Sequence, residues 1–257
     1  MEQSKSIEAV KNAVVKQELK PKVTINSIIE AQIKELKRCL PNDMSPSRLC
    51  RIALTCFKST PKLSNCSTES FVAALFQSAQ LGLEPGVGGE AYLIPYGNKV
   101  NFQIGYQGLM KLFYRHEHSS TLTVEKVCEN DVFEYEYGTD AKIKHIPSLT
   151  NRGKTVAFYA IATMKDGNKI IKIMSKDECI EHGKKHSKSY SFSDSCWQTD
   201  PDAMCKKTVL IQILKTLPKS VEIQKALAMD NTTKSRVTED MSLVKDETDW
   251  STNEEVA

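Results

Sequence analysis

The sequence predicts an α+β fold in which N-terminal helices precede a mainly antiparallel sheet and further helices pack on that sheet. Apolar residues recur at helical spacing in residues 24–81 and again after residue 175, whereas apolar and polar residues alternate through much of the middle of the chain. The dipeptide Asp166-Gly167 between two strand-like runs is typical of a hairpin turn. Together these observations favour a sheet built from hairpins rather than from parallel crossovers.

Three helices are predicted before the first strand. The first spans Thr24–Leu40, where isoleucines and leucines form one stripe. The second begins at Ser45, with Pro46 in its first turn. The third runs from about Ser67 to Leu81, and Gly82 follows it as a C-cap.

A hairpin that leads directly into a helix is predicted next. Glu90–Ile94 forms the first strand, Pro95–Asn98 carries turn residues, and Val100–Ile104 alternates as a half-buried strand does. The spacing becomes helical over Tyr106–Glu117. We expect the sharp reversals to bring together a set of polar and basic side chains: Lys99, Gln103, Tyr106, Gln107 and Lys111.

The rest of the predicted fold alternates strands and then returns to helices. Four strand-like runs follow: Thr121–Cys128, Val132–Tyr137, Thr155–Met164 and Lys169–Met174. Thr155–Met164 is apolar on both faces, which predicts a central strand. Ser175 and Glu178 form a capping box for a helix that ends near His186, and Asp200-Pro201 opens a helix that ends at Leu217. Residues 187–199 are predicted to be a loop, and Lys219–Met229 a short closing helix.

Charge divides the chain of 257 residues into a basic body and an acidic end. From Asp230 onward there are eight acidic and three basic residues, so the net charge of +3 leaves +8 for residues 1–229. We therefore expect a mobile N-terminal arm over residues 1–22, one folded domain over 23–229, and a disordered acidic tail over 230–257. The chain shows no long apolar run and no signal-peptide pattern, so we expect a cytoplasmic protein with its eight cysteines reduced.

Patterns typical of enzymes are weak in this sequence. Gly153-Lys154-Thr155 resembles the end of a phosphate loop, but Ser148 replaces the required first glycine and a strand follows instead of a helix. The carboxylates near Glu129 fit the solvated side of a strand better than a magnesium site. Cys179, His182 and His186 have spacing that zinc could use, but no C-x-x-C pair supports such a site. We expect no catalytic residue, no metal and no cofactor.

Basic and aromatic side chains on a sheet and its helices suit a protein that binds single-stranded nucleic acid, because cations follow the backbone and planar groups stack on bases. The candidates fall in the hairpin with its helix, in the loop before the long helix, and on the long helix itself. The candidate DNA-binding residues are Lys99, Gln103, Tyr106, Gln107, Lys111, Arg115, Lys184, Lys185, Lys188, Trp197, Lys206, Lys207 and Lys215.

Several long motifs follow one another in this chain, among them CFKSTPKLSNCSTESFVAALFQSAQLGLEPG, AYLIPYGNKVNFQIGYQGLMKL and MCKKTVLIQILKTLP. This series resembles the RecT family of phage single-strand annealing proteins, and the resemblance extends over about residues 25–230. It departs from the family pattern at Gln107, at Tyr114-Arg115 and at Ile211-Gln212, where basic residues are common. The departures predict weaker DNA binding, or contacts moved to Lys111, Lys184, Lys185 or Lys188.

The resemblance implies a non-enzymatic, ATP-independent protein that anneals complementary DNA strands during recombination. It makes residues 23–229 the DNA-annealing and oligomerisation domain. It implies single-stranded and annealed duplex DNA as ligands, a ring or helical filament of its own copies, and a phage exonuclease and host single-strand binding protein as partners, in a bacterial or phage-infected cell. The acidic tail would contact such a partner or keep the protein soluble. The alternative function is a protein that binds and protects single-stranded nucleic acid without annealing it.

Overall fold

The computed structural model describes residues 25–42, 44–187, 189–217 and 221–247. The predicted arm over residues 1–22 lies outside these ranges, as do the last ten residues. Within them the fold is α+β with antiparallel sheets, as the sequence predicts. No helix in the described ranges combines the length and apolar character needed to cross a bilayer.

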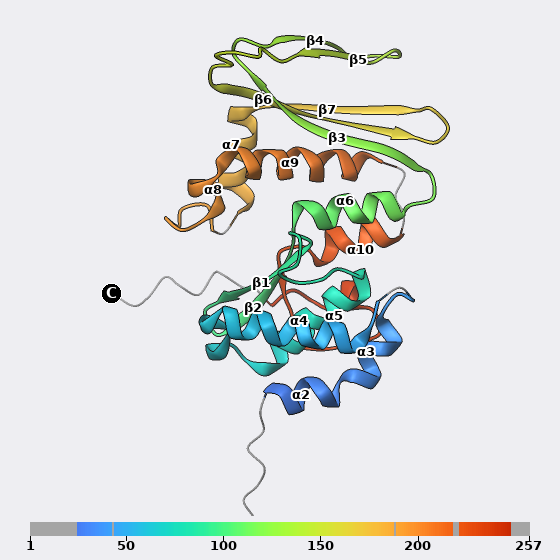
Figure 1. Cartoon of the computed structure of the whole chain (residues 1–257), viewed down its shortest axis with the longest axis vertical. Coiled ribbons are helices and arrows are strands. Elements are labelled where there is room, and N and C mark those ends of the chain that lie inside the picture. The colour runs from blue at the N-terminus through green and yellow to red at the C-terminus, as the bar shows by residue number, and fades with distance from the viewer. Residues whose placement is uncertain (1–24, 43, 188, 218–220, 248–257) are drawn as a thin grey trace, which may run out of the picture.

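The N-terminal helices form one end of the molecule (Figure 1). They are α2 (Ile25–Ala31), α3 (Ile33–Cys39), α4 (Pro46–Ser59), the 3₁₀ turn η1 (Pro61–Asn65) and α5 (Thr68–Leu81). The single helix predicted over Thr24–Leu40 is wrong, because a turn at Gln32 divides it into α2 and α3. The predicted end of α5 is confirmed, since Gly82 adopts the left-handed conformation with φ of 60°.

The first sheet follows α5. Strands β1 (Ala91–Tyr96) and β2 (Lys99–Ile104) pair as the predicted hairpin, and β8 (Thr232–Thr233) adds to the other edge of β2. Helix α5 packs against β2, and α6 (Tyr106–Arg115) begins immediately after the hairpin. The alternation of β2 turns Val100, Phe102 and Ile104 into the core, where none of them is exposed.

The second sheet has the order β3-β6-β7 and occupies the other half of the molecule. Its strands are β3 (Ser119–Cys128), β6 (Thr155–Met164) and β7 (Lys169–Ser175), so the predicted central position of β6 is confirmed. Helices α7 (Lys176–His186) and α9 (Pro201–Thr216) pack on this sheet, with the short α8 (Cys196–Thr199) between them in sequence. The predicted capping box at Ser175 and cap at Asp200 are both formed.

A separate hairpin of β4 (Val132–Glu136) and β5 (Lys142–Ile146) lies on the side of the sheet away from α9 (Figure 1). The sequence analysis missed β5. Its base is held by the buried Asp131, which accepts hydrogen bonds from the Arg152 guanidinium at 3.0 Å and from the backbone of Ser148 at 2.9 Å. The Arg152 guanidinium holds the pKa of Asp131 far below its usual range. The Phe133 ring stacks on Tyr159 of β6, with 5.6 Å between centroids.

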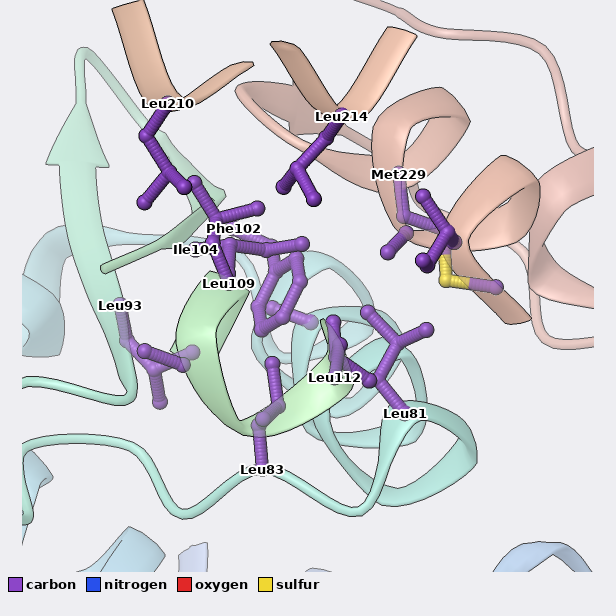
Figure 2. Packing of buried hydrophobic residues seen from close by; sticks show 14 of the residues in the cluster. Leu81, Leu83, Leu93, Phe102, Ile104, Leu109, Leu112, Leu210, Leu214 and Met229 are labelled. Carbon is purple, nitrogen blue, oxygen red and sulfur yellow. The ribbon is translucent and has the colours of Figure 1, made fainter. Parts of the chain in front are cut away.

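One apolar core joins the two halves. Figure 2 shows Leu210 and Leu214 of α9 facing side chains of the first sheet and α6, with Met229 of α10 (Val221–Met229) at the side. The buried members shown there are Leu81, Leu83, Leu93, Phe102, Ile104, Leu109, Leu112, Leu210, Leu214 and Met229. Because α9 also packs on β3-β6-β7, it couples the sheets mechanically.

The prediction that disorder begins at residue 230 is wrong for residues 230–247, which the structure places against the body. This segment contains β8 and the 3₁₀ turn η2 (Met241–Leu243). Two glutamines of α5 hold it: Gln77 donates to the Thr232 hydroxyl at 2.9 Å, and Gln80 accepts from the Met241 backbone at 2.8 Å. Met241 is also fully buried in the core, so polar contacts and one apolar anchor together hold a segment whose composition is mostly polar.

Candidate nucleic-acid interface

A groove of about 430 Å³ separates the β1–β2 hairpin from the segment 187–197. It gathers aromatic rings, amides and hydroxyl groups from parts of the chain that are distant in sequence. The lining residues are Lys62, Ile94, Pro95, Tyr96, Gly97, Gln103, Ser187, Ser189, Phe192, Asp194, Ser195, Cys196, Trp197, Met204 and Asn231.

Close backbone packing fixes the hairpin wall of this groove. A Cβ atom on Gly105 would lie 1.9 Å from the Gly89 carbonyl oxygen, and one on Gly108 would lie 2.1 Å from the Glu90 carbonyl oxygen. Only glycine can occupy these two positions, because backbone atoms cannot move aside as a flexible side chain does. The start of α6 is therefore locked against residues 89–90, and the end of β2 that carries Gln103 has a fixed position.

Trp197 fixes the opposite wall. Its six-membered ring packs on Gly183 of α7, where an added Cβ would approach the ring to 2.6 Å. Tyr190 lies beside the indole, with 5.6 Å between ring centroids. The side chain of Trp197 is buried, yet its Nε1–H has no hydrogen-bond partner within the described residues. Because this nitrogen is itself inaccessible, a ligand acceptor can pair with it only if the groove wall moves aside.

The structure brings Gln103 and Trp197 of the predicted set to this groove. Lys184 and Lys185 lie exposed in the last turn of α7, directly before the segment that forms the second wall. Lys215 is exposed near the end of α9. No ion pair holds these three lysines within the part of the chain that the structure describes. Lys188 lies outside the described residues.

Three other predicted lysines are paired with carboxylates. Lys99 donates to Glu247 at 2.9 Å, Lys111 donates to both carboxylate oxygens of Glu90 at 2.8 Å, and Lys206 lies 3.6 Å from Glu125. All these side chains keep some solvent exposure, so a polyanion could compete for the lysines. Their present role is to hold neighbouring elements together.

Two predicted cations have internal roles. Lys207 is buried, and its Nζ lies 3.9 Å from Asp230. The Arg115 guanidinium donates to the carbonyl oxygens of Leu81 and Gly82, at 2.7 and 3.0 Å, and thereby caps the end of α5. Lys206 and Lys207 are therefore not equivalent, although the sequence presents them as a pair.

The remaining two candidates lie on the first turn of α6. Gln107 is exposed, whereas Tyr106 is half-buried, and burial raises the pKa of its phenol. Gln107 lies within reach of the loop before β1, because its Cγ would be 3.7 Å from a Cβ on Gly89. It thus faces the surface of the hairpin rather than the interior.

Sequence reasoning missed several groove residues, among them Lys62, Tyr96, Phe192 and Asn231. Phe192 is 49% exposed, which is unusual for a phenylalanine and suits a stacking surface. Its place in the polar, aromatic-dotted segment 187–199 was a usable signal. Lys62 and Asn231 had no local signal, because only the folded chain brings η1 and the residue after α10 to the hairpin.

The zinc spacing of Cys179, His182 and His186 leads to different partners in the fold. His182 Nε2 accepts from the Gln212 amide at 2.9 Å, and the free thiols of Cys179 and Cys205 form a hydrogen bond. The Gly153-Lys154-Thr155 sequence leads into β6, a strand, as expected.

Comparisons with known proteins agree with the motif series. A family model described as the RecT family matches residues 47–246. Protein RecT of Escherichia coli strain K12 is 38% identical over 216 residues, which cover 80% of this chain and 79% of that protein. The uncharacterized protein YqaK of Bacillus subtilis strain 168 is 28% identical over 186 residues, covering 72% of this chain and 64% of that protein. The chain belongs to the RecT family.

Proposed function

We propose that this protein anneals complementary single strands of DNA without ATP, as part of phage-type homologous recombination. The observation that carries the proposal is the RecT family match over residues 47–246. Membership of this family makes the chain a recombination protein, and the family's members are annealing proteins rather than enzymes. The groove beside the hairpin supports the proposal, because it offers a strand a concave surface lined by aromatic and polar side chains.

The chemistry of the groove suits bases as well as phosphates. Exposed Phe192 and the half-buried Tyr96 offer planar surfaces, and base–aromatic stacking contributes about 1–3 kcal/mol per base. Unpaired lysines at the end of α7 and α9 would follow the backbone. Binding phosphates releases counterions, so affinity falls as salt rises, with a slope of about −0.7 per phosphate contact on a single strand.

Annealing follows if the protein neutralises the backbone and leaves pairing edges accessible. Two single strands repel each other through their phosphates, and a basic surface lowers that repulsion. Watson–Crick pairing then provides both the sequence specificity and the driving force, so the protein needs no nucleotide cofactor.

A long tract of DNA requires more than one subunit, because one binding fold holds about 4–16 nucleotides. We propose a ring or helical filament in which the grooves of successive copies form a continuous track. A phage exonuclease would supply the single strands, and a host single-strand binding protein would compete for them.

Annealing of two complementary strands of about 80 nucleotides, several times the span of one binding fold, tests the proposal. The strands are mixed without ATP, with and without protein, over a series of salt concentrations, and pairing is followed by fluorescence quenching between end labels. Protein-dependent pairing that slows as salt rises is expected. Tight binding that blocks pairing would instead identify a protective binding protein, and loss of strand length would identify a nuclease.

A further inference from the structure

Two histidines lie on the part of α7 that contacts α9, and one lysine from each helix lies near the first of them. His182 and His186 are one turn apart on α7, with 4.5 Å between ring centroids. Lys185 of α7 and Lys215 of α9 are close enough to act electrostatically on His182. Two helices thus contribute to one cluster of cationic and titratable groups, which we call the His–Lys cluster.

Among the described residues, no carboxylate forms an ion pair with this cluster. The groups that act on His182 are His186 and Lys185 from α7, and Gln212 and Lys215 from α9. Glu178 is engaged in the capping box with Ser175, and exposed Glu181 makes no ion pair within the described residues. Burial lowers the pKa of His182 first, and His186, Lys215 and Lys185 lower it further. Each of these charged neighbours acts on His182 in the same direction, as expected for a site that lacks its anion.

Helix capping accounts for only part of this arrangement. Basic residues in a last helical turn interact favourably with the helix dipole, which explains Lys184, Lys185 and His186. It does not explain Lys215, which comes from another helix. Nor does it explain His182, which lies a full turn earlier and is partly buried.

We propose that the His–Lys cluster binds a phosphate of the DNA backbone, and that it binds more tightly as the solution becomes more acidic. The proposal rests on the proposed function and adds a site and its regulation to it. The cluster lies at the end of α7, directly before the segment that forms one wall of the groove, so a strand leaving the groove can continue onto it.

The hydrogen bond of His182 indicates how protonation would act. Neutral His182 accepts from the Gln212 amide nitrogen through Nε2, which leaves its proton on Nδ1. Protonation of Nε2 would set two donors face to face, so the Gln212 amide must turn and present its oxygen. The protonated cluster then offers two imidazolium and two ammonium groups to one anion.

Linkage fixes the direction of the effect. A bound phosphate favours the charged imidazoles, so DNA binding takes up protons and its affinity rises as pH falls. An average uptake of about one quarter to one half of a proton between pH 8 and pH 6 predicts roughly three- to tenfold tighter binding at pH 6.

The test measures binding of a labelled oligothymidine to the full chain by fluorescence anisotropy at pH 6, 7 and 8. The test variant is His182→Gln with His186→Gln. The matched control is His116→Gln with His118→Gln, a second histidine pair whose rings lie 5.4 Å apart at the end of α6. The control should keep the pH dependence of the unmodified protein, and the test variant should lose it.

Calorimetry provides a second readout. Binding enthalpies measured in buffers of different ionisation enthalpy give the number of protons taken up, which should fall toward zero in the test variant. The single variant His186→Gln, at an exposed position, should keep the melting temperature and lose part of the proton uptake.

The outcomes are separable. An unmodified protein that binds no oligothymidine at any pH would overturn the proposed function itself. Binding without pH dependence, or pH dependence that survives in the test variant, would overturn the phosphate site and leave the function standing.

Discussion

Two regions differ in whether their lysines form ion pairs: the β1–β2 hairpin with α6, and the last turns of α7 and α9. Around the hairpin, Lys99 and Lys111 each hold a carboxylate at 2.9 Å or less. At the ends of α7 and α9, Lys184, Lys185 and Lys215 hold none within the described residues. A lysine that is already paired braces the fold, whereas an unpaired lysine is available to a ligand. The positions of basic residues in a sequence do not distinguish the two.

The largest expected effect concerns the packing that holds the hairpin. Gly108→Ala would set a Cβ 2.1 Å from the Glu90 carbonyl oxygen, so the loop before β1 or the start of α6 must move. We expect a loss of about 3 kcal/mol in the free energy of unfolding, at the upper end for overpacking. Denaturant unfolding measures it. Gln107→Ala, one residue earlier and exposed, should leave stability within about 0.5 kcal/mol.

Removing the unpaired lysines would sharpen the comparison. The triple variant Lys184→Ala, Lys185→Ala, Lys215→Ala should lower single-strand affinity by about 10- to 100-fold and flatten the salt slope by about 2, the value for three lost phosphate contacts. Its melting temperature should change little, because all three side chains are exposed. The variant Lys111→Ala should instead lower the melting temperature and leave the single-strand affinity and the salt slope almost unchanged. Equal salt slopes in the two variants would contradict the division into paired and unpaired lysines.

Phe192→Ala tests stacking apart from charge. Loss of one base contact should cost about 1–3 kcal/mol of binding free energy. The salt slope should stay unchanged, because no phosphate contact is lost. Tyr135→Ala is the control, since Tyr135 is an exposed aromatic residue on the β4–β5 hairpin, outside the groove. An unchanged affinity in the Phe192→Ala variant would mean that the bases do not bind in the groove.

The smallest effect is expected from Glu247→Gln, which would release Lys99. An exposed ion pair contributes about 0.5 kcal/mol, so single-strand affinity should rise about twofold. Titration at low salt measures the change. Glu239→Gln removes the same charge from an exposed position on the same segment and should have less effect. A fall in affinity would show that the 230–247 segment helps DNA binding instead of competing with it.

Local signals in the sequence predicted most of the fold. A few neighbouring residues determine each of three features: the capping box at Ser175, the start of α9 at Asp200-Pro201 and the cap at Gly82. Strand β5 escaped prediction because Lys142–Ile146 is short and half charged, and its partner strand determines its pairing. The helix break at Gln32 has no glycine or proline to mark it.

The site was harder to predict because its charges are decided by distant partners. Nothing near Lys99 in sequence indicates Glu247, and nothing near Lys207 indicates Asp230. Lys207 is buried because it lies on the same side of α9 as the apolar stripe, and the spacing of that stripe in the sequence could have shown this. The groove itself forms only when residues 187–197 meet the hairpin, so its members Gln103 and Trp197 were found by residue type and not by position.

The contact between Trp197 and Gly183 gives the groove its own optical reporter. The chain has two tryptophans, Trp197 and Trp250, so Trp250→Phe would leave the groove residue as the sole indole emitter. A nucleobase that enters the groove should quench that emission, and an acceptor that reaches Nε1 should shift its wavelength. Strand arrival can thus be timed in a stopped-flow instrument without any dye, and compared with the later moment at which the two strands pair.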